Sequence, residues 1–167
     1  LARPGLFPCL DRLAGGWVRD FDEELPDEEI LEDLTAQHLD NLDNEGRKLL
    51  GKAGITITTP ESAVMNLPTK SIKGLKTWES TEITNKSGET LKITATPAIH
   101  TSNPALREAV GEVTGFILEW KGQKDGAFYI SGDTVWIDEI NEIAKRYKVS
   151  AGILHLGAAN VPAVGDN

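Results

Sequence analysis

The sequence predicts a mixed α/β (α+β) fold, an α/β sandwich, and two patterns along the chain indicate it. Short apolar and β-branched segments separated by turn residues follow one another from residue 76 to residue 131, which is typical of a β-meander. A helical pattern over residues 135–147 then leads into an apolar segment, 149–157, and such alternation favours helices layered on a sheet. A length of 167 residues with 40% apolar residues suits one domain with one hydrophobic core.

Composition and charge exclude several classes of protein. The chain has 17 basic and 26 acidic residues, a net charge of −9, and no basic stripe, so we expect no nucleic-acid partner. No apolar stretch reaches the roughly 18 residues of a transmembrane helix, so we expect no membrane partner. Cys9 is the only cysteine, which excludes an internal disulfide and favours a reducing, cytoplasmic setting.

Residues 1–34 are interpreted as an acidic, poorly structured N-terminal segment. Nine carboxylates and no basic residue lie between Asp20 and Asp33. A short helix over about Asp27–Leu34 is expected inside this segment. The segment is interpreted as a solvated linker, and a functional acidic tail or cation-binding surface is the alternative.

A second region, residues 35–167, carries the regular patterns. Asp43 is placed to cap a helix that runs to Ala53 and ends at Gly54. A β-branched strand over Ile55–Thr59 follows, and Pro60 opens a short helix to Asn66. Residues around Pro68 and Gly74 are expected to form a loop.

The rest of the chain is expected to form strands and one amphipathic helix. The helix spans Val135–Tyr147, with four apolar or aromatic side chains on one face, and leads into a buried strand over Val149–Gly157. The face comprises Trp136, Ile140, Ile143 and Tyr147. The other strands are Lys76–Ile83, Thr90–Thr96, Val113–Lys121 and Ala127–Ser131, with turns at Asn85–Gly88 and Gln123–Gly126.

Four polar residues near predicted strand ends are candidate metal ligands. His38 and Asp40 form an H-x-D pair, whose two-residue spacing places both side chains on one side of an extended chain. His100 follows the strand LKITATPA, and Asp133 follows the strand AFYISG. Strand ends at one edge of a sheet converge, and imidazole with carboxylate is a ligand set for Zn²⁺, Fe or Mn.

Each of these residues also has a purely structural interpretation. Asp40 or Asp43 can cap the helix that follows, and Asp133 or Thr134 can cap the helix that begins at Val135. His100 can be a surface loop histidine. His155 lies within the apolar run ILHL and is interpreted as a hydrogen-bonded core histidine rather than a ligand.

The order of the segments resembles a known family. The runs HLDNLDNEGRKLLGKAGITITTPESA, LKITATPAIH, GFILEWKGQKDGAFYISGDTVW and ILHLGAANVP are similar to the metallo-β-lactamase superfamily. Within it, the chain looks closest to the branch that is similar to L-ascorbate-6-phosphate lactonase. The resemblance covers about residues 35–167 and implies an αβ/βα sandwich with a metal site at one edge between two sheets.

The resemblance also assigns roles to individual residues. The family motif H-x-H-x-D-H falls on residues 36–41, where His38 and Asp40 match and Ala36 and Asn41 do not. The next family histidine matches His100, and the metal-bridging aspartate matches Asp133. These four ligands imply one zinc ion (or manganese or iron) per chain, with Asp40 also the catalytic residue that orients water or accepts its proton.

The implied function is metal-dependent hydrolysis of a small ester, lactone or phosphoester. The alternative is a catalytically inactive, metal-free fragment or binding module of the same fold, which Ala36 and Asn41 favour. A third interpretation is an unrelated α/β domain with chance matches. Because the resemblance implies that the C-terminal part of the sandwich is absent, exposed sheet edges are expected to promote self-association.

Overall fold

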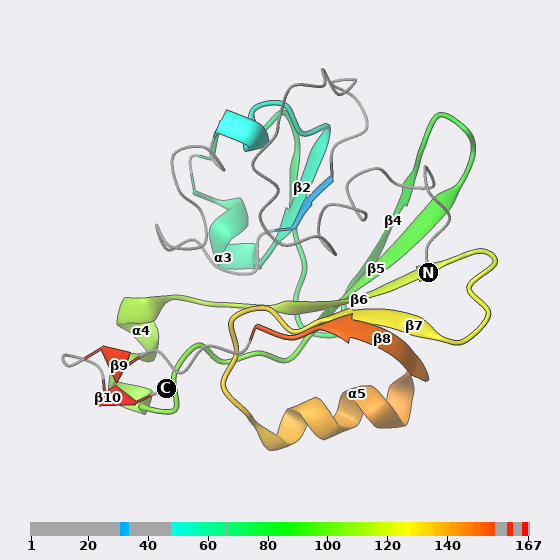
Figure 1. Ribbon diagram of the computed structural model, residues 1–167. Coiled ribbons are helices and arrows are strands. Elements are labelled where there is room, and N and C mark those ends of the chain that lie inside the picture. The colour runs from blue at the N-terminus through cyan, green and yellow to red at the C-terminus, as the bar shows by residue number, and fades with distance from the viewer. Residues whose placement is uncertain (1–30, 34–47, 66, 156–159, 162–164, 167) are drawn as a thin grey trace.

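The computed structural model describes residues 31–33, 48–65, 67–155, 160–161 and 165–166 (Figure 1). A short helical segment over residues 48–50 comes first among the helices. The elements that follow in chain order are β1 Leu31–Asp33, β2 Ile55–Thr58, α3 Pro60–Ala63, β3 Ile72–Gly74, β4 Ser80–Thr84, β5 Thr90–Thr96, a 3-10 turn Pro104–Leu106, α4 Arg107–Val110, β6 Gly115–Trp120, β7 Ala127–Ile130, a 3-10 turn Asp138–Ile140, α5 Asn141–Arg146, β8 Val149–Ile153, β9 Asn160–Val161 and β10 Gly165–Asp166.

A five-stranded sheet with the order β4-β5-β6-β7-β8 is the centre of the fold. Neighbouring strands are antiparallel from β4 to β7, joined by hairpins between β4 and β5 and between β6 and β7 and by a longer connection with α4 between β5 and β6. Strand β8 then pairs parallel to β7, because α5 carries the chain back along the sheet between them. A three-stranded parallel sheet, β1-β2-β3, lies beside it, and β9 pairs with β10.

Side-chain alternation gives the central sheet two apolar faces. Leu91, Ile93 and Ala95 of β5 join Phe116 and other residues in one buried cluster, which also contains Ile57 of β2. The opposite face contributes Ile117, Ala127 and Tyr129, which pack with Ile143 of α5 in a second cluster. The small sheet therefore lies on one face and α5 on the other, which Figure 1 shows above and below β6–β8.

The strands at the centre confirm the predicted α/β sandwich class. Strand β5 has the predicted bounds, and β2, β6 and β7 lie within the predicted segments. The predicted turn at Asn85–Gly88 is also confirmed, since the N–H of Gly88 donates to the carbonyl of Asn85 and Gly88 has φ of +79°. Helix α3 begins at Pro60 as predicted, and Thr59 caps it.

Two short parallel strands depart from the sequence prediction. Residues 31–33, expected in a helix, form β1 and pair with β2, because ladder hydrogen bonds to a β-branched strand outweigh weak helix propensity. Residues 72–74, expected in a loop, form β3 on the other side of β2. A side chain at Gly74 would place its Cβ 2.6 Å from the Cα of Pro60, so a glycine lets β3 approach α3. The other predictions for residues 1–30 and 34–47 lie outside the described residues.

The strand predicted over 76–83 and the helix predicted over 135–147 both begin later than expected. Residues 76–79 form a turn in which Trp78 has φ of +68°, and β4 starts at Ser80. Val135 donates its backbone N–H to the carbonyl of Ile99, and this bond holds the segment extended up to Ile137. Trp136, predicted on the packed face of the helix, is therefore 70% exposed.

The last strand of the central sheet is exposed, although its apolar sequence predicted a buried strand. Four of the five β8 residues are exposed, and among the described strands β8 has one hydrogen-bonded neighbour, β7. His155, predicted as a core histidine, is also exposed, and its backbone N–H donates to Ser131. Both predictions were wrong because a sequence gives the apolarity of a strand but not its position at the edge of a sheet.

We expect the exposed edge of β8 to cause self-association. This edge carries no Lys or Pro, which commonly protect edge strands. The purified protein should sediment as species larger than a monomer, and Ala151→Lys, which places a charge on the edge, should shift it towards the monomer. Ser87→Lys, which adds the same charge to the exposed 85–88 turn, serves as the control. A monomer at all concentrations for the unsubstituted chain would contradict this expectation.

We expect the stability of the fold to fall above pH 10 because of Tyr129. Burial raises the pKa of Tyr129 above its usual 10, and the neighbouring Thr96 hydroxyl offsets part of the rise. In the unfolded chain the phenol loses its proton near pH 10, earlier than in the folded chain, so this contribution to stability is complete below pH 10 and is lost above it.

Urea unfolding between pH 7 and pH 11.5 measures this effect. Tyr129→Phe should keep the stability at pH 7 within about 1 kcal/mol and should flatten the fall above pH 10. An equally steep fall in Tyr129→Phe would show that another group is responsible.

Candidate functional site

The structure brings two of the four predicted ligands together. The Nε2 atom of His100 lies 3.0 Å from the Oδ2 atom of Asp133. His38 and Asp40, predicted as the other two ligands, lie outside the described residues. The predicted convergence of strand ends is therefore observed for His100 and Asp133, and it stays a prediction for the H-x-D pair.

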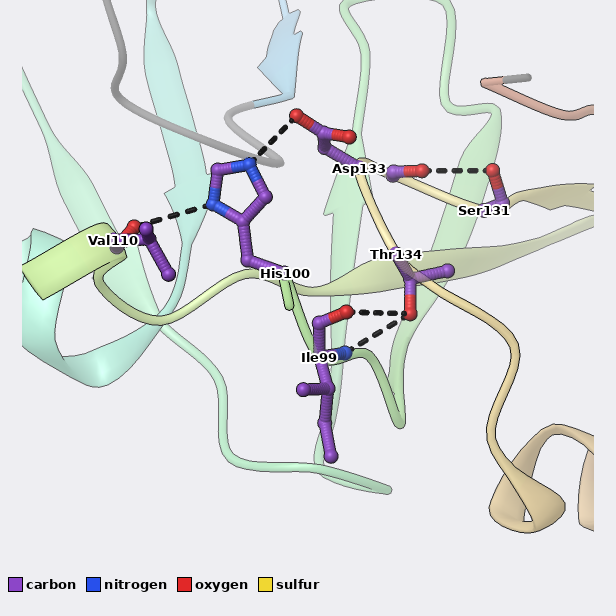
Figure 2. Close-up of polar contacts among 7 residues, drawn as sticks. Ile99, His100, Val110, Ser131, Asp133 and Thr134 are labelled. Carbon is purple, nitrogen blue, oxygen red and sulfur yellow. Dashed lines mark hydrogen bonds and ion pairs between the residues drawn. The ribbon is translucent and has the colours of Figure 1, made fainter. Parts of the chain in front are cut away.

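His100 is held by the end of β5 and by α4. Its side chain is 11% exposed, so it is not the surface loop histidine of the structural interpretation. The Nδ1 atom of the ring lies 3.2 Å from the carbonyl oxygen of Val110, the last residue of α4 (Figure 2). This contact orients the ring so that its other nitrogen faces Asp133.

Asp133 lies in a loop that hydrogen bonds tie to the segment around His100. The hydroxyl oxygen of Thr134 accepts a hydrogen bond from the N–H of Ile99 at 2.9 Å and lies 3.3 Å from the carbonyl of Ile99 (Figure 2). On the other side of Asp133, the hydroxyl of Ser131 donates to the carbonyl of Gly132 at 2.8 Å. Neither Asp133 nor Thr134 caps a helix, since the helical turns begin only at Asp138. Instead, Thr134 joins the segment that follows β7 to the segment that follows β5 through its hydrogen bonds with Ile99.

The contacts of the imidazole are compatible with a cation shared by His100 and Asp133. If Nδ1 carries the proton that the Val110 carbonyl accepts, a neutral ring has a lone pair on Nε2. That lone pair faces a carboxylate oxygen at 3.0 Å, and two electron-rich atoms at that distance repel each other unless a cation lies with them. A second proton on the ring or a metal ion bound by both atoms removes this repulsion, and so does the other neutral tautomer, whose Nε2–H donates to Asp133.

A hollow of about 650 Å³ opens beside His100. Its walls include Ile99, Val110 and Val113, and its charged residues are Lys76, Arg107, Glu61, Glu108 and Glu112. The carboxylate of Glu61 accepts a hydrogen bond from the N–H of Glu112 at 3.2 Å, which joins α3 to the segment before β6. The sequence did not single out these residues, because they come from four separate segments and no short motif connects them.

Among the described residues, no third His, Cys, Asp or Glu completes a group of three around His100 and Asp133. Zinc in catalytic sites is commonly bound by three protein ligands and a water molecule. One imidazole and one carboxylate would provide two of those three ligands. The donor atoms that the structure describes therefore fit a metal ion in kind.

Comparison with known families agrees with the fold. The sequence model of the Beta-lactamase superfamily domain matches residues 34–160, which include both His100 and Asp133. No curated protein sequence matches the chain significantly. No helix in the described part of the chain has the length and apolarity that a membrane span requires. The match extends over most of the chain, and the chain belongs to the metallo-β-lactamase superfamily.

Solved structures with a similar fold include three hydrolases. An isothiocyanate hydrolase from Delia radicum gut bacteria shares 24% identity over 80% of this chain and 51% of its own, with a TM-score of 0.61. A possible metal-dependent hydrolase from Veillonella parvula shares 20% identity over 81% of this chain and 51% of its own (TM-score 0.66). The metallo hydrolase Igni18 from the archaeon Ignicoccus hospitalis KIN4/I shares 21% identity over 75% of this chain and 51% of its own (TM-score 0.55). The chain spans about half the length of these proteins, and at such identities they show the fold.

We expect Thr134 to position Asp133 through its bonds to Ile99. Thr134→Val removes the hydroxyl and leaves the N–H of Ile99 without this acceptor, so it should lower the free energy of unfolding by about 1–2 kcal/mol. Thr134→Ser keeps the hydroxyl and should stay close to the unsubstituted protein. Urea unfolding measures both variants, and equal stability of Thr134→Val and Thr134→Ser would contradict the role of the hydroxyl.

Proposed function

We propose that this chain is the site-bearing part of a metal-dependent hydrolase that acts on a small ester, lactone or phosphoester. The observation that carries the proposal is the pairing of His100 and Asp133, with the far side of the imidazole anchored on Val110. Histidines that bind a metal through one ring nitrogen commonly donate the N–H of the other nitrogen to a backbone carbonyl, which fixes the orientation of the ring. Val110 provides such a carbonyl for His100.

Four residues would hold the ion in this proposal: His38, Asp40, His100 and Asp133. We propose one ion per chain, zinc before manganese or iron, because neutral imidazole and carboxylate suit zinc and the family motif has Ala36 and Asn41 where two histidines are expected. A bound ion of this kind lowers the pKa of water to about 7, which provides a nucleophile at neutral pH.

Asp40, His100 and Asp133 would each have a separate role in this proposal. Asp40 orients the attacking water and accepts its proton, which is the role of a general base. His100 stays in position because its Nδ1 atom remains bonded to Val110. Asp133 lies in a loop that Thr134 joins to Ile99 and Ser131 joins to the backbone N–H of His155.

The lining of the hollow beside His100 suits a small substrate with an apolar part. Ile99, Val110 and Val113 provide apolar wall, and Lys76 and Arg107 provide cationic groups at its border. Esters, lactones and phosphoesters are therefore the first substrates to test. Isothiocyanates belong in the same panel, because one protein with a similar fold is an isothiocyanate hydrolase.

The narrower assignments are part of the same proposal. Within the superfamily, we place the chain in the branch that is similar to L-ascorbate-6-phosphate lactonase, on the ordered segments that surround His100 and Asp133. A single cysteine supports a cytoplasmic setting.

Metal content, measured by elemental mass spectrometry on the purified protein, tests the proposal. We expect about one equivalent of zinc, manganese or iron per chain, lost in both His100→Ala and Asp133→Ala. His155→Ala is the matched control, since His155 is an exposed histidine outside the proposed ligand set and should leave the metal content unchanged.

The alternative function gives a different result in the same measurement. A catalytically inactive, metal-free binding module would contain no metal even after reconstitution with each of the three ions. Equal loss of metal in all three variants would indicate adventitious binding to surface histidines and would also contradict the proposal.

A further inference from the structure

A second hollow, of about 530 Å³, lies at the opposite end of the central sheet from His100. It is lined by residues near the start of β5, the end of β6 and the start of β7, whereas His100 and Asp133 follow the ends of β5 and β7. The other wall comes from the last residue of α5 and the two residues after it, Arg146, Tyr147 and Lys148. The hollow is therefore separate from the site proposed for hydrolysis.

The charge of this hollow is opposite to that of the chain. Its lining contains four cationic residues, Lys92, Lys121, Arg146 and Lys148, against two carboxylates, Glu82 and Glu119, a local net charge of +2. The whole chain has a net charge of −9. A concave surface lined by one excess sign concentrates ions of the opposite sign, so this hollow attracts anions.

Of the two carboxylates, Glu119 forms an ion pair with Lys92, and Glu82 lies opposite Lys92 in the sheet. Glu82 and Glu119 face Lys92 from the neighbouring strands β4 and β6. The Nζ atom of Lys92 lies 3.1 Å from Glu119, and this contact, together with the charge of Glu82, raises the pKa of Lys92. No carboxylate of the described residues lies within ion-pair distance of Lys121, Arg146 or Lys148.

Arg146 is held in place by an aromatic ring. Its guanidinium lies over the indole of Trp78, 4.3 Å from the ring centroid. Trp78 is the non-glycine residue with positive φ in the described part of the chain, and its turn brings the indole beneath the end of α5. Stacking uses the flat face of the guanidinium and leaves its in-plane N–H groups for a planar or tetrahedral oxyanion.

We propose that this hollow binds a small phosphate-type dianion, either inorganic phosphate or a phosphate monoester. Arg146 donates two hydrogen bonds to the oxyanion, and Lys121 and Lys148 supply the remaining positive charge. Because the ligand joins the end of α5 to the hairpins of the sheet, its binding stabilises the packing of α5.

Calorimetric titration with inorganic phosphate, at constant ionic strength and after removal of metals with EDTA, tests this proposal. We expect saturable binding that Arg146→Gln weakens about tenfold or more, since a charged hydrogen bond contributes about 1.5–3 kcal/mol. Arg146→Lys keeps the charge but not the planar donor pair. Its affinity for phosphate should therefore lie between those of the unsubstituted protein and Arg146→Gln.

Two control variants distinguish binding in this hollow from general attraction of phosphate to positive charge. Lys145→Gln removes a neighbouring charge that is paired with Glu142 and does not line the hollow, so it should leave the affinity for phosphate unchanged. His100→Ala should also leave it unchanged, because His100 lies at the other end of the sheet. Equal weakening by Lys145→Gln would mean non-specific charge attraction, and absence of saturable binding would overturn the proposal.

The source of the phosphate group is distinguished by a second titration. Phenyl phosphate carries the same oxyanion with an aromatic ring that Tyr147, in the lining, can contact. Tighter binding of phenyl phosphate than of inorganic phosphate would assign a phosphate monoester as the ligand class, and equal or weaker binding would assign inorganic phosphate.

Discussion

The period-two alternation of side chains along β5, β6 and β7 is the constraint on which the rest of this molecule depends. It places Leu91 and Phe116 on the face covered by the small parallel sheet, and Ile117 and Tyr129 on the face covered by α5. A shift of one residue in the register would exchange the two faces and expose both sets of apolar side chains. The strand ends are consequently fixed in position, and so are the residues that follow them.

His100 and Asp133 are the clearest result of that fixed register. Each follows the end of one of these strands, and hydrogen bonds from Thr134 to Ile99 join the two loops. The Val110 carbonyl behind His100 then leaves Nε2 facing a carboxylate, where a proton on the ring or a bound metal ion satisfies both atoms. The chemistry proposed for this protein therefore follows from backbone pairing that is set several residues away.

The central strands and the proximity of His100 to Asp133 could be predicted from the sequence, because both depend on local patterns. Residues 90–96 alternate regularly, and His100 and Asp133 each stand directly after a recognisable strand. The start of α3 could equally be predicted from Pro60, whose ring favours the first turn of a helix.

Features that depend on distant contacts could not be predicted in this way. The short strands β1 and β3 exist because β2 provides a partner, and three residues are too few to carry a pattern of their own. The exposure of β8 and His155 depends on which strand stands at the edge of the sheet. The charged hollows combine residues from several segments, and only the folded chain brings these together.

The central claim is that His100 and Asp133 bind a metal ion through Nε2 and Oδ2, and nitrogen NMR of the imidazole rings tests it most directly. The chain has three histidines, so the signals of His100 can be assigned by comparison with His100→Ala. On addition of zinc, we predict that the Nε2 resonance of His100 moves to the range of metal-bound nitrogen while Nδ1 keeps its proton. A His100 spectrum that zinc leaves unchanged would contradict the account.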